Sequence, residues 1–336
     1  MATIDIVIPT YNGAIYIRET ISSILSQDYK DFRLLICDDA SKDSTIKIIK
    51  EIKDKRIVLI KNTDNLGYSL NLERARKYAT AEFIYLMGQD DIMATGALKD
   101  TINAFNLTDQ IGAITRPYFW FDKNINIPVR AKKQLNAKKN IIVRVDDNPK
   151  KVIRVFETLD QLSGLAYRRK FMDLPFHQDI FPCHIYPFAS IFKKHPIVFL
   201  KNYTIAVRIG SSQTRSLSSI YNKSPLLSWI EMVKSIYSEK KYLSIQKYLI
   251  KDFITKNYVG LVQIKNYAKY QYLIREIWYL IKFNWHNLFN PYFWFFSIGS
   301  LITPANILIP AVDWYKNNIY SQSLKHIKFN YLYQWK

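Results

Sequence analysis

Two pairs of neighbouring aspartates carry the side chains best suited to chemistry. Asp38-Asp39 and Asp90-Asp91 each follow a short apolar run. A carboxylate at the end of a buried strand needs a partner or access to water, because an unpaired buried charge is costly. Mg²⁺ and Mn²⁺ prefer carboxylate oxygens together with the phosphate oxygens of a substrate. The pairs therefore predict a metal-bridged diphosphate site, and the alternative for each pair is a helix cap.

The apolar runs that precede such polar residues predict a parallel sheet. They are short and rich in β-branched or aromatic residues, and they cover 4–8, 33–37, 57–60 and 83–87. Helical spacing of apolar residues separates them, and this alternation is typical of an α/β fold. Ligands of such sheets bind at the carboxyl ends of the strands. We therefore expect one crevice lined by three strand ends, which carry Pro9, Thr10, Tyr11 and Asn12, then Asp38 and Asp39, then Gln89, Asp90 and Asp91.

The formal charge of +20 lies outside the first hundred residues. Residues 1–100 contain 14 Lys and Arg against 15 Asp and Glu, whereas the rest of the chain contains 34 against 13. The basic part predicts an anionic partner. Cys37 and Cys183 are too few and too far apart for a disulfide framework or a zinc site with short ligand spacing. Since the N-terminus is also unlike a signal peptide, we expect a cytoplasmic protein.

Four motifs follow one another in the first half of the chain, VIPTYNG at 7–13, ICDDASKDST at 36–45, NLGYSLNLERA at 65–75 and GQDDIM at 88–93. In order and spacing they resemble the inverting family 2 glycosyltransferases, over about the first 120 residues. The resemblance implies a GT-A type, Rossmann-like central sheet, mostly parallel and flanked by helices. It also implies transfer of a sugar from a nucleotide diphosphate donor (UDP-, GDP- or dTDP-sugar) to a saccharide hydroxyl, with Mn²⁺ or Mg²⁺ as cofactor.

The resemblance implies roles for individual residues. Thr10, Tyr11 and Asp39 would hold the nucleotide base, with the Tyr11 ring stacked on it. Asp90 would touch the ribose and Asp91 would bind the metal. The other residues expected to bind the nucleotide sugar are Pro9, Asn12, Asp38, Asn65, Gly67, Asn71, Gln89, Gly164 and Arg215.

Some of these expectations have an alternative or a departure from the family. The first acidic position of the family's D-x-D pattern is Gly88 here, so the metal site would depend on Asp91 alone. Asn71 fits an ordinary helix start as well as a ligand contact. Ser163-Gly164-Leu165 resembles the segment that lines the sugar and acceptor pocket. Arg208 or Arg215 could neutralise the diphosphate, although a solvated basic loop is the alternative for each.

An inverting transfer needs a base that takes the proton of the acceptor hydroxyl. His184 lies in DIFPCHIYPF at about the position where the family has an acidic base, and an unperturbed imidazole is a competent base. Asp179 is the second candidate because it would restore the usual carboxylate. The alternative to both is a structural, hydrogen-bonded His184.

The chain is expected to consist of two domains. Residues 1–222 would form the catalytic domain, with a nucleotide-binding half at 1–120 and an acceptor half at 121–222 that contains an exposed loop at 122–150. Residues 223–336 would form a basic, aromatic, helical and membrane-associating appendage. Its segment 288–312 contains no charged side chain, but the prolines favour shallow insertion over a transmembrane helix. Tryptophans and lysines suit an anionic lipid surface.

These features predict a peripheral enzyme on the cytosolic face of the inner membrane, with a polyprenyl-linked saccharide as acceptor in surface polysaccharide synthesis. The alternative is a basic protein that binds nucleic acid, or a membrane scaffold, built on an inactive GT-A fold. The neutral first hundred residues and the absence of a nucleic-acid-binding motif argue against nucleic acid as a partner. A buried hairpin or a dimer contact is the alternative for the C-terminal region.

Overall fold

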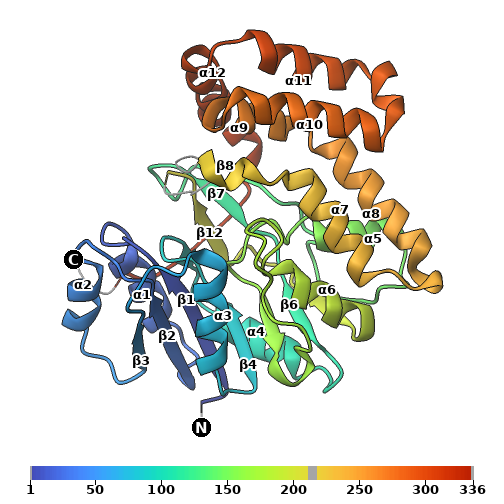
Figure 1. Cartoon of the computed structure of the whole chain (residues 1–336). Helices are drawn as coiled ribbons and strands as arrows, with labels where there is room; N and C mark the ends of the chain where they lie inside the picture. The colour runs from blue at the N-terminus through green and yellow to red at the C-terminus, as the bar shows by residue number, and fades with distance from the viewer. Residues whose placement is uncertain (1, 211–217, 334–336) are drawn as a thin grey trace. The chain divides into compact units, whose positions relative to one another are not determined.

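The computed structural model describes residues 2–210 and 218–333. The chain divides into two compact units, Met1–Arg208 with Lys325–Lys336, and Ile209–Leu324 (Figure 1). This division differs from the expected boundary at 222/223, and the end of the basic region belongs to the first unit. The two units are described separately below.

The first unit contains a central sheet of eight strands in the order β3-β2-β1-β4-β10-β6-β11-β9. Its first four strands pair in parallel, whereas β10 is antiparallel to both of its neighbours and β9 is antiparallel to β11. The strands are β1 (Ile4–Thr10), β2 (Phe32–Asp38), β3 (Ile57–Lys61), β4 (Phe83–Leu86), β6 (Ala113–Thr115), β9 (Ile141–Val143), β10 (Ala166–Arg168) and β11 (Ile197–Phe199). The mixed, mostly parallel α/β sheet predicted from the sequence is therefore confirmed.

Helices cover both faces of the parallel part of the sheet. Ile4, Ile6 and Ile8 of β1 pack in one core with Ile17 and Ile21 of α1. The helix α3 contacts β1 and β2 and lies in front of them in Figure 1. Right-handed crossovers on both sides of β1 explain why α3 covers the face opposite α1. The helices of this unit are α1 (Ile17–Leu25), α2 (Thr45–Glu51), α3 (Tyr68–Tyr78), α4 (Ala97–Phe105), α5 (Pro149–Phe156) and α6 (Ile185–Lys194).

A second sheet has the order β5-β12-β7-β8, with β5 (Ile92–Met93), β12 (Ile205–Arg208), β7 (Phe119–Phe121) and β8 (Pro128–Ala131). The strands β8 and β9 lie within 122–150, so the expectation of an exposed loop is wrong for these two stretches, while most of the remaining segment is irregular and exposed or half-buried. Both strands are very short, and their own residues show no alternation. β8 pairs with the preceding strand β7, whereas β9 pairs with β11, which is distant in sequence, and tertiary contacts of this kind override local pattern.

The C-terminal segment returns to the first unit. Ile327, Phe329 and Tyr331 pack on the core of the second sheet, and the Phe329 ring meets Phe119 edge to face at a centroid distance of 5.1 Å. The backbone N–H of Thr95 donates to the carbonyl of Asn330 at 2.9 Å. Apolar residues alternate at 327, 329 and 331, which is the pattern of a half-buried extended segment. This alternation could have predicted that the segment packs on a sheet.

The second unit is helical, as the sequence predicted from about residue 225 onward. Its helices are α7 (Pro225–Ile236), α8 (Leu243–Lys256), α9 (Tyr258–Tyr267), α10 (Tyr270–Phe283), α11 (Pro291–Ile302) and α12 (Ala305–Asn318). Ser224 caps α7 by accepting from the N–H of Leu227, with Pro225 at the first helical position. Among the helices of the described residues, none combines the length and hydropathy that a bilayer crossing requires.

Candidate active site

The carboxyl ends of three neighbouring strands lie side by side at one edge of the central sheet. The strands β2, β1 and β4 are adjacent and parallel. The register places Thr10 beside Asp38 and Pro9 beside Cys37, and Gly88–Asp91 follows the end of β4. The fold therefore brings together the strand ends that the sequence predicted to meet.

Two buried oxygens at these strand ends have no partner within the described residues. Asp38 accepts a hydrogen bond from the backbone N–H of Ser41 at 3.0 Å through Oδ2. Its Oδ1 and the hydroxyl of Thr10 are buried without a hydrogen bond. Buried polar atoms are almost always paired in folded proteins, and exceptions often mark a ligand site. Asp38 and Thr10 are therefore the strand-end residues best placed to bind a polar ligand.

Asn12 ties the loop after β1 to the loop after β2. Its backbone N–H donates to the hydroxyl of Ser41 at 2.9 Å, and its side-chain oxygen accepts from the N–H of Lys42 at 2.9 Å. Asn12 adopts a left-handed conformation with φ of 49°, which asparagine tolerates better than most residues. In this structure Asn12 shapes the site by holding two loops together.

Gln89 braces the loop after β1 from the other side. Its side chain accepts from the N–H of Tyr11 at 2.9 Å and donates to the carbonyl of the same residue at 3.1 Å. A Cβ atom on Gly13 would lie 2.5 Å from Gln89 Oε1, so a larger residue there would displace the Gln89 side chain. The bracing leaves the Tyr11 ring 37% exposed, so its face remains accessible to a ligand.

Asp39 holds the loop that precedes α3. One carboxylate oxygen accepts from the side chain of Asn62 at 2.7 Å and from the N–H of Leu66 at 2.8 Å. The other oxygen accepts from the N–H of Gly67 at 2.9 Å, and Asn65 donates to the carbonyl of Asp39 at 3.2 Å. Gly67 has φ of +82°, which glycine adopts without strain. The Asn-x-Gly loop is therefore built around this buried carboxylate.

Asn71 connects α3 to the central sheet. Its amide donates to the carbonyl of Cys37 at 2.8 Å, and its oxygen accepts from Asn62 at 3.0 Å. The side chain is 1% exposed. Both polar atoms are thus used inside the protein, which agrees with the alternative of a structural role at this helix start.

Oxygens from three residues converge above Gly88. A Cβ atom on Gly88 would lie 2.8 Å from Asp91 Oδ2, 3.1 Å from Asp90 Oδ1 and 3.2 Å from the Ser163 hydroxyl. Asp91 is buried, and its Oδ2 accepts from Ser163 at 2.5 Å and from Gln161 at 3.2 Å. Burial raises the pKa of Asp91 well above its usual value, and Asp90 raises it further. Glycine at this position leaves the space into which the carboxylates point.

The carboxylate oxygens of Asp90 and Asp91 suit a divalent cation that takes most of its ligands from a bound substrate. Among the described residues no group of three His, Cys, Asp or Glu side chains could hold a metal ion. Asp90 and Asp91 are nonetheless close enough to share the space above Gly88. Mg²⁺ in nucleotide sites is commonly bound by one or two carboxylates plus substrate phosphates. Two carboxylates without a third are compatible with that kind of site.

Arg208 connects the acidic motif to α1 and to the C-terminal segment. Its backbone N–H donates to Asp91 Oδ1 at 3.0 Å, and its Nε donates to the carbonyl of Asp90 at 3.2 Å. The guanidinium lies over two aromatic rings and pairs with Glu19 at 2.6 Å. The hydroxyl of Tyr331 donates to the other oxygen of Glu19 at 3.2 Å. Glu19 and Tyr331 were missed from the sequence, since neither belongs to a motif.

His184 is buried at the N-cap of α6. Its Nε2 lies 2.8 Å from the carbonyl of Leu159, which can only accept, so Nε2 carries the proton. The other ring nitrogen is buried without a partner among the described residues. Burial lowers the pKa of His184 to about 4. These surroundings favour the structural alternative over the base role expected from the sequence, because no ring nitrogen is open to an acceptor hydroxyl.

The buried imidazole predicts a loss of stability in mild acid. The folded-state pKa of His184, about 4, lies below the unfolded value of 6.5, so the unfolded chain binds more protons as the pH falls through 6.5. Between pH 7 and pH 5 this group should cost roughly 2 kcal/mol of the unfolding free energy. Urea unfolding at both pH values, for wild type and His184→Gln, measures it. A wild type that loses no more stability than the variant would contradict the prediction.

Asp179 lies near Cys183 in the segment that precedes α6. Burial, with smaller contributions from Glu73 and Asp179, raises the pKa of Cys183 to about 12. Burial also raises the pKa of Tyr68 well above its usual value, as do the neighbouring Cys183 and Asp91. Tyr68 at the start of α3 is thus electrostatically linked to Asp91 and to Cys183, and it was not among the residues predicted from the sequence.

Gly164 and Arg215 were also expected at the site, and of these two only Gly164 lies within the described residues. Gly164 has φ of +90°, and a Cβ there would lie 2.8 Å from Ile205 and 3.1 Å from Arg116. Glycine is therefore required for close packing, directly after Ser163. Arg215 lies outside the described residues.

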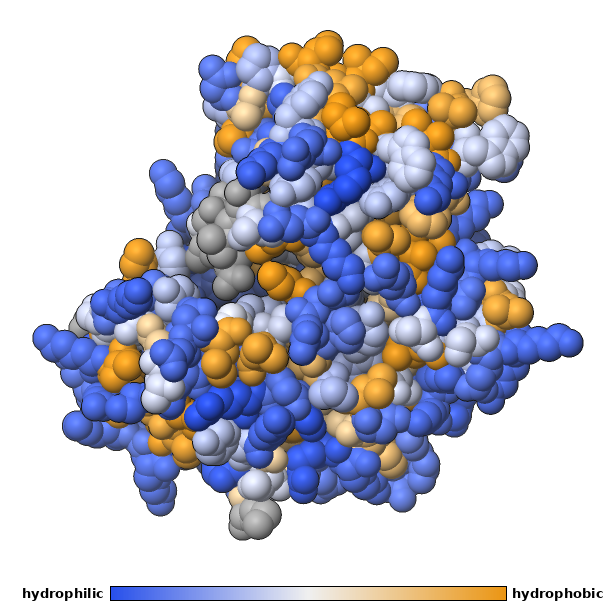
Figure 2. All heavy atoms as spheres, viewed as in Figure 1, coloured by the Kyte–Doolittle hydropathy of each residue, from blue (hydrophilic) through white to orange (hydrophobic). Residues whose placement is uncertain are grey.

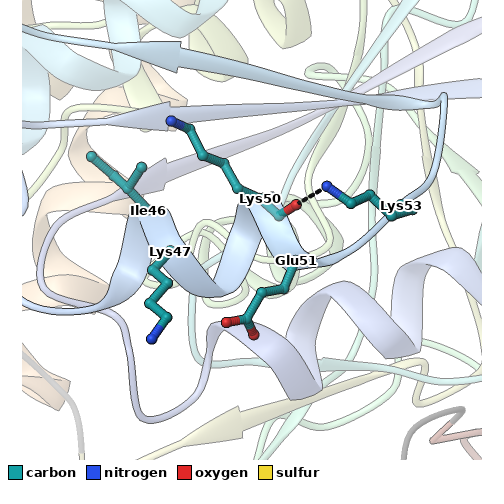
Figure 3. Close-up of a pocket in the computed structure, with 5 residues that line it drawn as sticks. All are labelled: Ile46, Lys47, Lys50, Glu51 and Lys53. Carbon is teal, nitrogen blue, oxygen red and sulfur yellow. Dashed lines mark hydrogen bonds between the residues drawn. The ribbon is translucent and has the colours of Figure 1, made fainter.

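An open depression of about 600 Å³ lies on the surface of α2. Figure 3 shows its lining residues, which are Ile46, Lys47, Lys50, Glu51 and Lys53. The ammonium of Lys53 donates to the carbonyl of Lys50 at 2.9 Å, and the lining is otherwise a set of solvent-facing side chains of one helix turn. None of the candidate site residues lines this depression, so it is not the active site.

The fold is that of a GT-A α/β domain, and residues 5–159 match the sequence profile described as Glycosyl transferase family 2. This segment is therefore a family 2 glycosyltransferase domain. It is 38% identical over 103 residues to "UDP-Glc:alpha-D-GlcNAc-diphosphoundecaprenol beta-1,3-glucosyltransferase WfaP" of Escherichia coli, which covers 31% of this chain and 41% of that protein. For WfgD of Escherichia coli the identity is 37% over 100 residues, covering 30% and 40%. The chain thus spans less than half the length of these curated relatives.

Solved structures share the fold over the whole chain. The structure of S. aureus TarS 1-349 superposes with a TM-score of 0.64 at 16% identity and covers 99% of this chain and 97% of that chain. A mannosyltransferase from Pyrobaculum calidifontis, solved in complex with GDP-Man and Mn2+, has a TM-score of 0.53 at 14% identity and covers 94% and 86%. These likenesses show the GT-A fold.

Proposed function

We propose that the protein transfers a sugar from a UDP-sugar to a hydroxyl of a saccharide linked to a polyprenyl diphosphate, with inversion. The unpartnered oxygens of Thr10 and Asp38 beside the Asp90-Asp91 motif, at the strand ends of a family 2 domain, carry this proposal. The names of WfaP and WfgD give UDP-Glc as donor and GlcNAc-diphosphoundecaprenol as acceptor of those proteins. S. aureus TarS was solved with UDP-GlcNAc.

On this proposal the strand ends bind the nucleotide. Tyr11 offers its exposed ring to the base, while Thr10 and Asp38 supply hydrogen-bonding oxygens. Asp39 keeps the loop at Gly67 in place beside the donor. Asn12 and the other bracing residues act indirectly, by fixing these loops.

We assign the metal to Asp90, with Asp91 as its support. Asp91 is fully buried and accepts three hydrogen bonds, from Arg208, Ser163 and Gln161, so its oxygens are already used. Asp90 is half-buried, and one of its oxygens lies beside the open space above Gly88. Bound there, Mn²⁺ or Mg²⁺ would stabilise the negative charge of the departing nucleoside diphosphate.

Asp179 is the proposed base. A carboxylate takes the proton of the acceptor hydroxyl as that oxygen attacks the sugar carbon, and the nucleoside diphosphate leaves from the opposite face. Asp179 is electrostatically linked to Cys183 beside Tyr68, whereas His184 has no accessible nitrogen. Asp179→Asn should therefore lower kcat with little change in the KM for the donor.

The test is a transfer assay with the full chain. UDP-Glc, UDP-GlcNAc and GDP-Man are offered with Mn²⁺, and the acceptor is a GlcNAc α-diphosphate on a lipid chain. Products are identified by mass spectrometry, and the new anomeric configuration by NMR. We expect one UDP-sugar to give an inverted product. Neither transfer nor hydrolysis of any donor by the folded protein would refute the function.

The second unit exposes an apolar surface that fits peripheral docking on the membrane that carries such an acceptor. Phe289 and Phe295 are 77% and 71% exposed, and Tyr292 and Ile302 are similarly exposed on α11. Figure 2 shows hydrophobic side chains gathered over this helix. Aromatic residues with nearby lysines such as Lys282 suit the headgroup region of an anionic bilayer.

Sedimentation with vesicles tests the docking surface. The full chain should pellet with vesicles that contain a quarter anionic lipid, and the double variant Phe289→Ser, Phe295→Ser should remain in the supernatant. Ile15→Ser is the matched control, because Ile15 is 82% exposed on the first unit. Equal pelleting of the double variant and the control would remove this surface as the docking site.

A further inference from the structure

Five residues near the acidic motif form a cluster to which no role has been given above. Trp120 of β7 lies directly opposite Arg130 of β8 in the strand register. The Arg130 guanidinium lies 4.3 Å and the Lys132 ammonium 5.6 Å from the centroid of the indole ring. The ring of Tyr118 meets the indole edge to face at 4.7 Å. Two cations thus lie against one indole ring. Trp120, Arg130, Lys132, Tyr118 and Asp160 are together called the Trp120 cluster.

Asp160 compensates only one of the two cations. It pairs with the Lys132 ammonium at 2.7 Å and accepts a hydrogen bond from the Tyr118 hydroxyl. Although burial opposes the effect, Lys132 and Arg130 lower the pKa of Asp160, so its charge persists at neutral pH. Arg130 is exposed, and within the described residues no carboxylate pairs with its guanidinium. The cluster therefore has one more positive than negative charge, and its exposed cation, the Arg130 guanidinium, lies over the Trp120 ring.

The Trp120 cluster is connected to the donor site through the loop after α5. Asp160 is followed by Gln161, whose amide lies 3.2 Å from Asp91 Oδ2, and Ser163 contacts the same oxygen. The loop after α5 thus carries the cluster to the edge of the Asp90-Asp91 motif.

The chemistry of the cluster suits a phosphate. A guanidinium presents a planar fork of N–H donors that matches phosphate oxygens, and a cation held on an aromatic face loses less conformational freedom on binding. A side chain fixed before the ligand arrives binds it with less entropic cost. Lys132, held by Asp160, provides a second positive charge nearby.

We propose that the Trp120 cluster is the acceptor subsite and that Arg130 binds the phosphate of a saccharide phosphate acceptor, with Trp120 and Asp160 as positioning residues. This inference rests on the proposed glycosyl transfer and specifies how its acceptor is recognised. A saccharide with a diphosphate at its reducing end would be distinguished from the same saccharide without phosphate by this contact.

The first experiment does not depend on catalysis. Binding of pyrophosphate to the full chain is measured by calorimetry with EDTA present and UDP saturating, so that the donor site is filled. Arg130→Ala should weaken pyrophosphate binding about tenfold or more. Lys123→Ala, an exposed lysine between β7 and β8, removes the same charge and should leave binding within about twofold of wild type. Pyrophosphate that competes with UDP, or that binds both variants equally, would overturn the proposal.

Kinetics then separate acceptor recognition from donor recognition. Arg130→Ala should raise the KM for a lipid diphosphate saccharide about tenfold or more while the KM for the UDP-sugar stays unchanged. The same saccharide as a methyl glycoside should react equally with wild type and variant. Trp120→Phe should retain the preference for phosphate and Trp120→Ala should lose it. A change in the donor KM alone would refute the acceptor assignment and leave the proposed transfer intact.

Discussion

Asp90→Asn is expected to lower kcat/KM for the sugar donor by about 100-fold or more, which corresponds to about 2.7 kcal/mol of transition-state stabilisation. Asp90 is the half-buried carboxylate beside the space above Gly88, where the diphosphate and its cation would lie. The isosteric amide keeps the shape and removes the charge, so the thermal midpoint should stay close to that of the wild type. Donor turnover at several Mn²⁺ concentrations, together with Mn²⁺ binding measured by electron paramagnetic resonance, gives the result.

Asp91→Ala provides the contrast that separates a ligand from a support. It removes the acceptor for the Arg208 N–H and for the side chains of Ser163 and Gln161. Unpaired buried donors of this kind should cost roughly 2–4 kcal/mol in unfolding free energy. If Asp90→Asn retained full Mn²⁺-dependent turnover, or if Asp91→Ala were inactive yet as stable as wild type, the metal would belong to Asp91.

The parallel half of the sheet could be predicted because its strands are buried on both faces. The run at 83–87 is apolar without interruption and the run at 4–8 is interrupted only by Asp5, so sequence alone identifies them. Three-residue strands such as β9 carry no such pattern, and their pairing exists only after distant partners have come together. The C-terminal segment did carry an alternating pattern, but its position at the end of a helical, basic region concealed it.

The location of the site could be predicted from the sequence, but the role of each residue in it could not. Motifs and strand ends placed Asn12, Gln89 and Asn71 at the site. A sequence, however, does not tell whether an amide faces a ligand or the neighbouring loop, and here all three face the protein. His184 shows the same limit, since its family position predicted a base and its burial favours a structural role.

Asp39 illustrates how one residue can serve both the fold and the site. Its carboxylate is 2% exposed and accepts from the Asn62 amide and from two consecutive backbone N–H groups, those of Leu66 and Gly67. Asp39→Ala would leave these three donors without their acceptor. Each hydrogen bond to a charged acceptor contributes about 1.5–3 kcal/mol, and because two of the three are only partly buried, we expect a loss near the low end of their sum, roughly 4–5 kcal/mol in unfolding free energy.

Urea unfolding measures that loss. Asp64→Ala is the matched control, because Asp64 is exposed in the same loop and its carboxylate accepts a hydrogen bond from its neighbour Thr63. The control should stay within about 0.5 kcal/mol of wild type. Since the loop at Gly67 is held by Asp39, the variant should also bind UDP more weakly at a temperature where it remains folded. If Asp39→Ala were as stable as Asp64→Ala, the loop would keep its conformation without the Asp39 carboxylate. The role of Asp39 would then be to bind the nucleotide base and not to stabilise the fold.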